Sequence, residues 1–131
     1  MKFTLVDQML ECGPDRAVAV KNVTASEEYL ADHFPSFPVL PGVFMLEAMV
    51  QAARAVLAER GCQRMMLGEV RALRYGTFVR PGESLKVEVE LVKTTDGAYS
   101  FKGSGSRVCV GTDDEPATAV SGRFTLRAAR V

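Results

Sequence analysis

The 131-residue sequence contains no tryptophan, a single histidine and only three cysteines. Cys12, Cys62 and Cys109 are widely spaced and form no Cys-x-x-Cys pair, which favours free thiols in a reducing compartment over a disulfide framework. With one histidine and no paired cysteines, no zinc site is expected. The 16 basic and 16 acidic residues leave no net charge, so the composition does not support general binding to nucleic acid or membranes.

A long uninterrupted apolar run is also absent. The longest candidate, residues 39–58, contains a proline and three polar side chains: Pro41, Glu47, Gln51 and Arg54. These interruptions argue against a transmembrane span. The N-terminal residues reach Asp7 too early for a signal peptide. The length and the 47% hydrophobic content are typical of one globular domain over residues 1–131, and we expect a cytoplasmic protein.

The same apolar run predicts a long helix from Gly42 to Arg60. Pro41 suits the first turn of a helix, and Gly61 suits the position just past its end. Such a helix would be about 28 Å long at 1.5 Å per residue. Its apolar residues do not fit one narrow stripe: Val43, Phe44, Met45, Leu46, Met49, Val50, Val56 and Leu57. A helix of this kind is normally buried, so the rest of the chain should wrap around it.

Polar and apolar residues alternate with a period of two over residues 86–93, which predicts a half-buried strand. Asp96 and Gly97 then predict a tight turn into a hairpin strand over residues 99–110. Further strand candidates are residues 16–23, 67–75 and 117–126. One long helix with an antiparallel sheet of five to six strands is an α+β architecture.

His33 and Glu47 lie 14 positions apart, separated by a loop rich in proline and by the start of the helix. A rigid loop, a helix start and two titratable side chains are components of an acid/base site. A lone histidine in an arbitrary sequence is most often structural, and a helical carboxylate is most often solvated. The assignment therefore depends on the residues around them.

Those residues resemble the 3-hydroxyacyl-[acyl carrier protein] dehydratases of the FabZ and FabA type. The family motif His-Phe-Pro-Gly-x-Pro-x-Met-Pro-Gly-x-x-x-x-Glu-Ala-x-x-Gln is matched at His33, Phe34, Pro35, Pro38, Pro41, Gly42, Glu47, Ala48 and Gln51. Glutamate at position 47 favours the FabZ branch. Ser36 replaces a glycine, Leu40 replaces a methionine, and residues 76–78 replace a basic segment of the family. The resemblance covers most of the chain and implies the hot-dog fold, in which the sheet wraps around one central helix.

The resemblance also implies a hydro-lyase that removes water from (3R)-3-hydroxyacyl-acyl carrier protein thioesters, giving trans-2-enoyl thioesters in fatty acid or related acyl-chain synthesis. His33 would be the base at C2, and Glu47, from the facing subunit, would assist departure of the 3-hydroxyl. The backbone amides of Gly42 and Val43 suit polarisation of the thioester carbonyl. Gln51, four residues after Glu47, could hold its carboxylate. No metal or redox cofactor is implied.

Two further sets of residues have competing interpretations. Four aromatic residues are candidates for an acyl tunnel, although aromatics near strands more often belong to the core: Phe34, Phe37, Tyr75 and Phe78. Residues 61–82 carry four arginines against Glu69: Arg64, Arg71, Arg74 and Arg80. They form either a docking patch for an acidic acyl carrier protein, centred on Arg71 and Arg74, or an ordinary solvated strand face.

Two alternative functions stay open. A hot-dog acyl thioesterase would hydrolyse the same acyl group and release free thiol. A non-catalytic dehydratase-like subunit would bind acyl chains without turnover. A site shared between subunits also predicts a homodimer or a higher oligomer of dimers.

Overall fold

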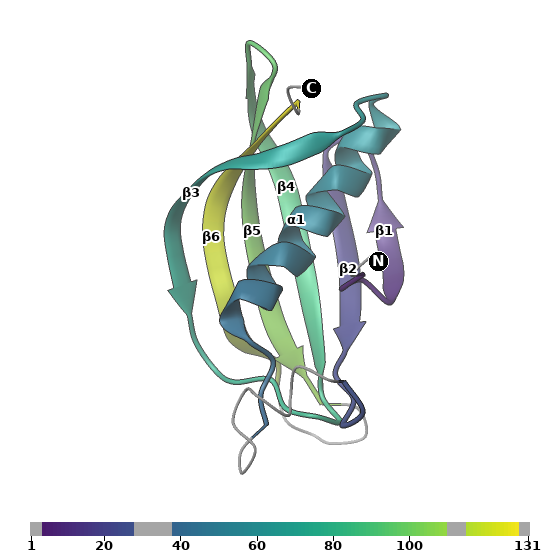
Figure 1. The fold of residues 1–131 in the computed structure, drawn as a ribbon, viewed down its shortest axis with the longest axis vertical. Helices are drawn as coiled ribbons and strands as arrows, with labels where there is room; N and C mark the ends of the chain where they lie inside the picture. The colour runs from purple at the N-terminus through teal and green to yellow at the C-terminus, as the bar shows by residue number, and fades with distance from the viewer. Residues whose placement is uncertain (1–3, 28–37, 110–114, 129–131) are drawn as a thin grey trace.

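The computed structural model describes residues 4–27, 38–109 and 115–128. Within these ranges the elements are β1 Gln8–Cys12, β2 Arg16–Asn22, α1 Gly42–Glu59, β3 Met65–Tyr75, β4 Ser84–Thr95, β5 Ala98–Val108 and β6 Ala117–Ala128. The strands form one antiparallel sheet in the order β1-β2-β4-β5-β6-β3, and α1 lies across one face of it (Figure 1). The predicted α+β class and the hot-dog architecture are therefore confirmed.

The ends of α1 follow from two residues with special backbone properties. Pro41, with φ −58°, precedes the first helical residue, where its missing N–H costs nothing. Gly61 has φ +82°, a left-handed conformation that favours glycine. Its N–H donates to the Ala58 carbonyl at 3.0 Å and that of Cys62 donates to the Leu57 carbonyl at 2.9 Å, the Schellman pattern of helix termination. No helical segment within the described ranges combines the length and the apolar character that a membrane span requires.

One side of α1 packs on the sheet, most extensively on β4 and β2. The buried residues of this side are Met45, Ala48, Met49, Val50, Ala52, Ala53, Val56 and Leu57. The sequence predicts that the helix is buried on all sides, and this prediction is wrong for its first turns. Val43 is 63% exposed, and Phe44 and Leu46 are only partly buried. Because the sheet of a single chain curves around one side of α1, apolar side chains remain uncovered on the other.

Backbone hydrogen bonds hold the start of α1 beside the segment that follows β3. The Leu40 amide donates to the Val79 carbonyl at 2.8 Å, and the Gly76 amide donates to the Ala119 carbonyl of β6 at 2.8 Å. A Cβ atom on Gly76 would lie 2.2 Å from the carbonyl oxygen of Thr118, so only glycine fits this approach. Three segments that are distant in the sequence therefore meet at the beginning of the helix.

Candidate active site

Glu47 lies on the second turn of α1 with its side chain 37% exposed. Gln51 Nε2 donates to Glu47 Oε1 at 3.2 Å, which is the contact that their spacing of four residues predicts. Gln51 is itself oriented by the Leu5 amide, which donates to Gln51 Oε1 at 2.7 Å. The candidate catalytic carboxylate is therefore held from its own helix and, through Gln51, from the N-terminal segment.

A second donor to Glu47 was not predicted from the sequence. Arg54 Nη1 donates to the same oxygen, Glu47 Oε1, at 3.2 Å, and Arg54 Nε donates to the Met65 carbonyl at 2.9 Å. Arg54 follows Glu47 by seven residues, or two helical turns, so the two side chains project within about 20° of one another around the axis. This spacing is a signal that could have identified Arg54 from the sequence.

The first turn of α1 presents the two amides proposed for thioester binding. The amides of Phe44 and Met45 bond to the Pro41 carbonyl at 3.0 and 3.2 Å. Those of Gly42 and Val43 have no hydrogen-bond partner among the described residues, as expected of the first N–H groups in a helix. They lie at the positive end of the helix dipole, an environment that stabilises a developing oxyanion.

An apolar pocket of about 410 Å³ opens at this helix start. Its walls are the residues that begin α1, the segment after β3, and one residue of β6: Val39, Leu40, Pro41, Gly42, Val43, Met45, Tyr75, Gly76, Thr77, Phe78 and Ala119. The volume is within the usual range for small-molecule sites. Tyr75 and Phe78, two of the four tunnel candidates, are in this lining.

Gly42 is in close contact with the ring of Tyr75. A Cβ atom on Gly42 would lie 2.7 Å from Tyr75 Cε1 and 2.8 Å from Cζ. Burial raises the pKa of the Tyr75 phenol, consistent with an environment that is partly shielded from water. The missing side chain at Gly42 thus lets the Tyr75 ring pack directly against the first residue of α1, within the wall of the pocket.

Glu47 does not line this pocket. It follows Gly42 by five residues, which places it about 7.5 Å further along the axis and about 140° around it. Its carboxylate is instead linked to the beginning of β3 by the hydrogen bonds of Arg54. Within one chain, the carboxylate and the apolar pocket are therefore separate.

Three of the predicted site residues, His33, Phe34 and Phe37, lie outside the described residues, as does Ser36. Their placement relative to Glu47 and the pocket stays a prediction.

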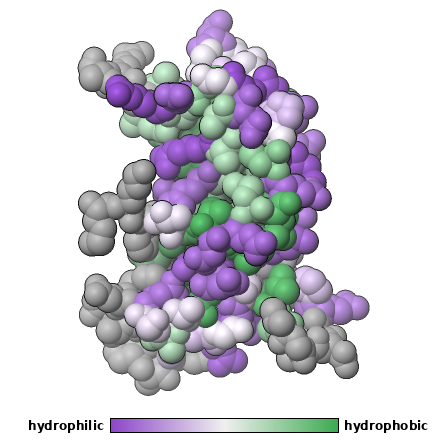
Figure 2. Space-filling model, turned by 90° about the vertical axis from the view of Figure 1, so that its right-hand side faces the viewer, coloured by the Kyte–Doolittle hydropathy of each residue, from purple (hydrophilic) through white to green (hydrophobic). Residues whose placement is uncertain are grey.

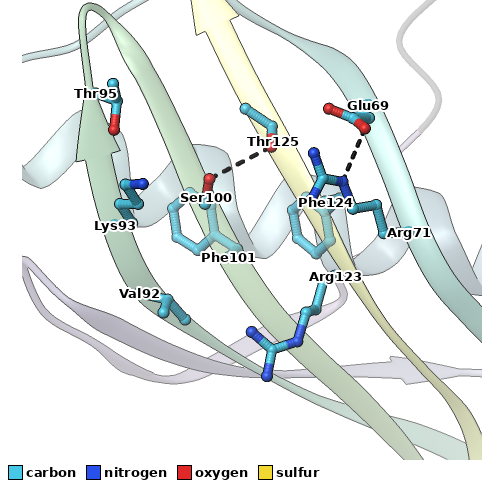
Figure 3. A pocket seen from close by; sticks show the side chains of 10 residues that line it. All are labelled: Glu69, Arg71, Val92, Lys93, Thr95, Ser100, Phe101, Arg123, Phe124 and Thr125. Atoms are coloured by element: carbon cyan, nitrogen blue, oxygen red, sulfur yellow. Dashed lines mark hydrogen bonds and ion pairs between the residues drawn. The ribbon is translucent and has the colours of Figure 1, made fainter.

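The predicted docking arginines, Arg71 and Arg74, lie on β3, which is an edge strand of the sheet. Arg71 and Glu69 border a hollow of about 380 Å³ on the sheet, where Arg71 Nε donates to Glu69 Oε1 at 2.8 Å (Figure 3). This hydrogen bond holds the pKa of the Glu69 carboxyl below its usual range. Lys93 and Arg123 border the same hollow (Figure 3). Arg74 is exposed further along the strand.

The fold and the pocket at the helix start define a protein of the hot-dog class. The family model described as ApeI-like, "ApeI dehydratase", matches residues 10–112. The chain belongs to this dehydratase family. It is 37% identical over 115 residues to the 3-hydroxyacyl-[acyl-carrier-protein] dehydratase FabZ of Geobacillus thermodenitrificans, a match that covers 82% of this chain and 79% of the relative. It is 39% identical over 105 residues to FabZ of Solibacter usitatus, covering 77% of this chain and 65% of the relative.

Solved structures show the same fold at lower identity. The dehydratase heterocomplex ApeI:P from Xenorhabdus doucetiae matches with a TM-score of 0.70 and 22% identity, over 97% of this chain and 84% of that one. A hypothetical thioesterase from Streptococcus pneumoniae, in complex with coenzyme A, matches with a TM-score of 0.70 and 12% identity, over 93% and 84%. Since dehydratases and thioesterases share the fold, the fold alone does not separate the two activities.

Proposed function

We propose that this protein removes water from 3-hydroxyacyl thioesters carried by an acyl carrier protein, in fatty acid or related acyl-chain synthesis. The observation that carries the proposal is the apolar pocket that ends at the unpartnered amides of Gly42 and Val43. An acyl chain fits an apolar pocket, and its thioester carbonyl fits a pair of helix N-terminal amides. The family assignment and the relatives named FabZ support the same reaction.

In this reaction His33 takes the proton from C2 of the substrate, which the adjacent thioester makes acidic. The electron pair of the C2–H bond moves toward the thioester carbonyl, where the amides of Gly42 and Val43 stabilise the negative charge. The pair then forms the C2–C3 double bond as the 3-hydroxyl departs with a proton as water. Glu47 assists that departure, and no redox step occurs.

The separation of Glu47 from the pocket of its own chain supports a site shared between two subunits. The sheet has two edges, of which β1 has 5 residues and β3 has 11. On the side that carries β1, hydrophilic residues are mixed with apolar ones (Figure 2). β3 exposes three large apolar side chains, Met66, Val70 and Tyr75. A long exposed edge strand of this kind is normally covered, so we propose a twofold homodimer joined along β3.

We further propose that the carrier docks near Arg71 and Arg74, whose positive charge suits an acidic partner. Because Glu69 already pairs with Arg71, Arg74 has the more available charge of the two. We place the protein in the cytoplasm, since its three free cysteines suit a reducing compartment.

The deciding experiment is hydration of a short trans-2-enoyl thioester, followed by loss of enoyl absorbance. Wild-type protein should be active, and His33→Ala and Glu47→Gln should each lower the rate by at least about 10²-fold, the usual scale for loss of a general acid or base. Glu59→Gln, on the last turn of the same helix, is the matched control and should keep full activity. Near-full activity of His33→Ala would refute the mechanism.

The same assay separates the alternative functions. Release of free thiol without hydration would identify a thioesterase. Binding of the thioester without either reaction would identify a non-catalytic acyl-binding subunit.

A further inference from the structure

Arg54 makes two hydrogen bonds that connect parts of the molecule with different roles. Its Nε donates to the backbone carbonyl of Met65, the first residue of β3, at 2.9 Å. Its Nη1 donates to Glu47 Oε1 at 3.2 Å, forming an ion pair along the helix. The guanidinium is planar and its donors point in fixed directions, so anchoring one donor on β3 fixes where the other points.

The ion pair between Arg54 and Glu47 is expected to add little to the stability of the fold. The side chains of Arg54 and Glu47 are 41% and 37% exposed, and ion pairs at such exposed positions contribute little to folding. Gln51 already donates to the same carboxylate oxygen. Two donors thus converge on Oε1, whereas Oε2 has no hydrogen-bond partner among the described residues.

We propose that Arg54 is a positioning residue for Glu47, fixing its carboxylate to β3 with Oε2 directed to the departing hydroxyl of the substrate. This inference rests on the proposed dehydration. In this arrangement Glu47 orients the departing hydroxyl by accepting a hydrogen bond from it, and it does not supply the proton. His33 then returns to the hydroxyl the proton that it took from C2. Water leaves, and His33 regains its starting charge, while Glu47 has exchanged no proton.

Other charged groups near Glu47 do not offer the same contact. Among the described residues, Arg54 is the charged side chain within ion-pair distance of it. Gln51, which packs beside it, is neutral, and Met65 on the facing strand contributes only its backbone carbonyl. The effect of Arg54 can therefore be isolated by substitution at this one position.

A double-mutant cycle tests the proposal: wild type, Arg54→Met, Glu47→Gln and the double variant, measured by enoyl thioester hydration. Arg54→Met should lower kcat at least about 10-fold with little change in KM, as expected when an interaction made in the transition state is lost. In the Glu47→Gln background the same substitution should change kcat by less than about 2-fold, because Arg54 acts through Glu47. Equal losses in both backgrounds would overturn the proposal and indicate a structural role through Met65.

Two further variants keep the test decisive. Arg54→Lys keeps the stem and the charge but not the planar fork, so its kcat should fall between those of wild type and Arg54→Met. If Arg54→Met fails to fold by circular dichroism, Arg54→Lys replaces it in the cycle, with loss again expected only when Glu47 is present. Arg60→Met is the matched control, since Arg60 bonds to Pro14 and Asp15 at the far end of the helix. Its kcat should equal that of wild type.

The outcomes also separate this inference from the proposed function. Wild-type protein without hydration activity would refute the dehydratase proposal, and the role of Arg54 with it. If His33→Ala and Glu47→Gln abolish activity while Arg54→Met keeps it, the dehydratase proposal stands and only the positioning role is refuted.

Discussion

Gly76 is the position where one methyl group should have the largest measurable effect on the site. Its backbone runs so close to β6 that a Cβ atom would lie 2.2 Å from the Thr118 carbonyl oxygen. Because that atom belongs to the backbone of a paired strand, neither partner can move aside without disturbing the sheet. Gly76→Ala must therefore push residues 76–78 away from β6.

The destabilisation has two sources, steric overpacking and weakened hydrogen bonds. Overpacking of this kind typically costs about 1–3 kcal/mol. The displaced segment would also weaken two hydrogen bonds, Gly76 N to Ala119 O at 2.8 Å and Thr77 N to Thr118 O at 3.0 Å. At about 0.5–1.5 kcal/mol each, they raise the total to roughly 2–6 kcal/mol. This is a large part of the roughly 5–15 kcal/mol by which such domains are stable. With an unfolding entropy of about 2.1 cal/mol/K per residue, the loss lowers Tm by roughly 7–22 °C.

Thermal unfolding followed by circular dichroism measures this shift. Gly13→Ala is the matched control, because its Cβ would meet only the Arg16 carbonyl oxygen, at an ordinary 3.9 Å. Its free energy of unfolding should stay within about 1 kcal/mol of wild type. Equal Tm values for the two variants would refute the close approach of residues 76–78 to β6, and with it the described shape of the pocket wall.

Three further predictions concern titration, assembly and the partner. Burial raises the pKa of the Tyr75 phenol in the native state. The native protein therefore keeps the phenol proton at a pH where the unfolded chain, with a tyrosine pKa of about 10, has lost it. The free energy of unfolding should fall as the pH rises above that value. In urea unfolding, Tyr75→Phe should lose less stability than wild type over this alkaline range; identical losses would contradict it. Mixing inactive His33→Ala and Glu47→Gln subunits should restore part of the activity if subunits exchange, whereas a strictly monomeric protein by light scattering would exclude the shared site. The KM for carrier-bound substrate should rise with salt, that for a small thioester should barely change, and charge reversal at Arg71 or Arg74 should reproduce the salt effect. Equal responses of both substrates would refute the docking patch.

The elements that the sequence predicted correctly are those specified by local chemistry. Pro41 and Gly61 set the limits of the helix through their backbone preferences. Asp96 and Gly97 have φ of +45° and +78°, the two positive values that a tight hairpin turn requires, and they join β4 to β5 as predicted. Such signals act over a few residues and need no knowledge of the rest of the chain.

The sequence pattern does not predict the strand β1, because β1 lacks such a local signal. Its five residues, Gln8–Cys12, are almost all exposed at the edge of the sheet. An edge strand with neither face fully buried lacks the alternation that reveals a strand in a sequence. Its position depends on pairing with β2, with a register shift between Met9 and Glu11, and not on a pattern of its own.

The candidate site divides in the same way between local and tertiary information. The motif around His33 and Glu47, the helix that carries Glu47 and the contact with Gln51 four residues later can all be read from the sequence, because a local motif or a fixed helical repeat encodes each of them. The segments that enclose the pocket, the absence of Glu47 from its lining and the link from Glu47 to β3 through Arg54 emerge only in the folded chain. Those features depend on how the sheet curves around the helix and on where residues far apart in the chain meet, and no periodicity in the sequence records either.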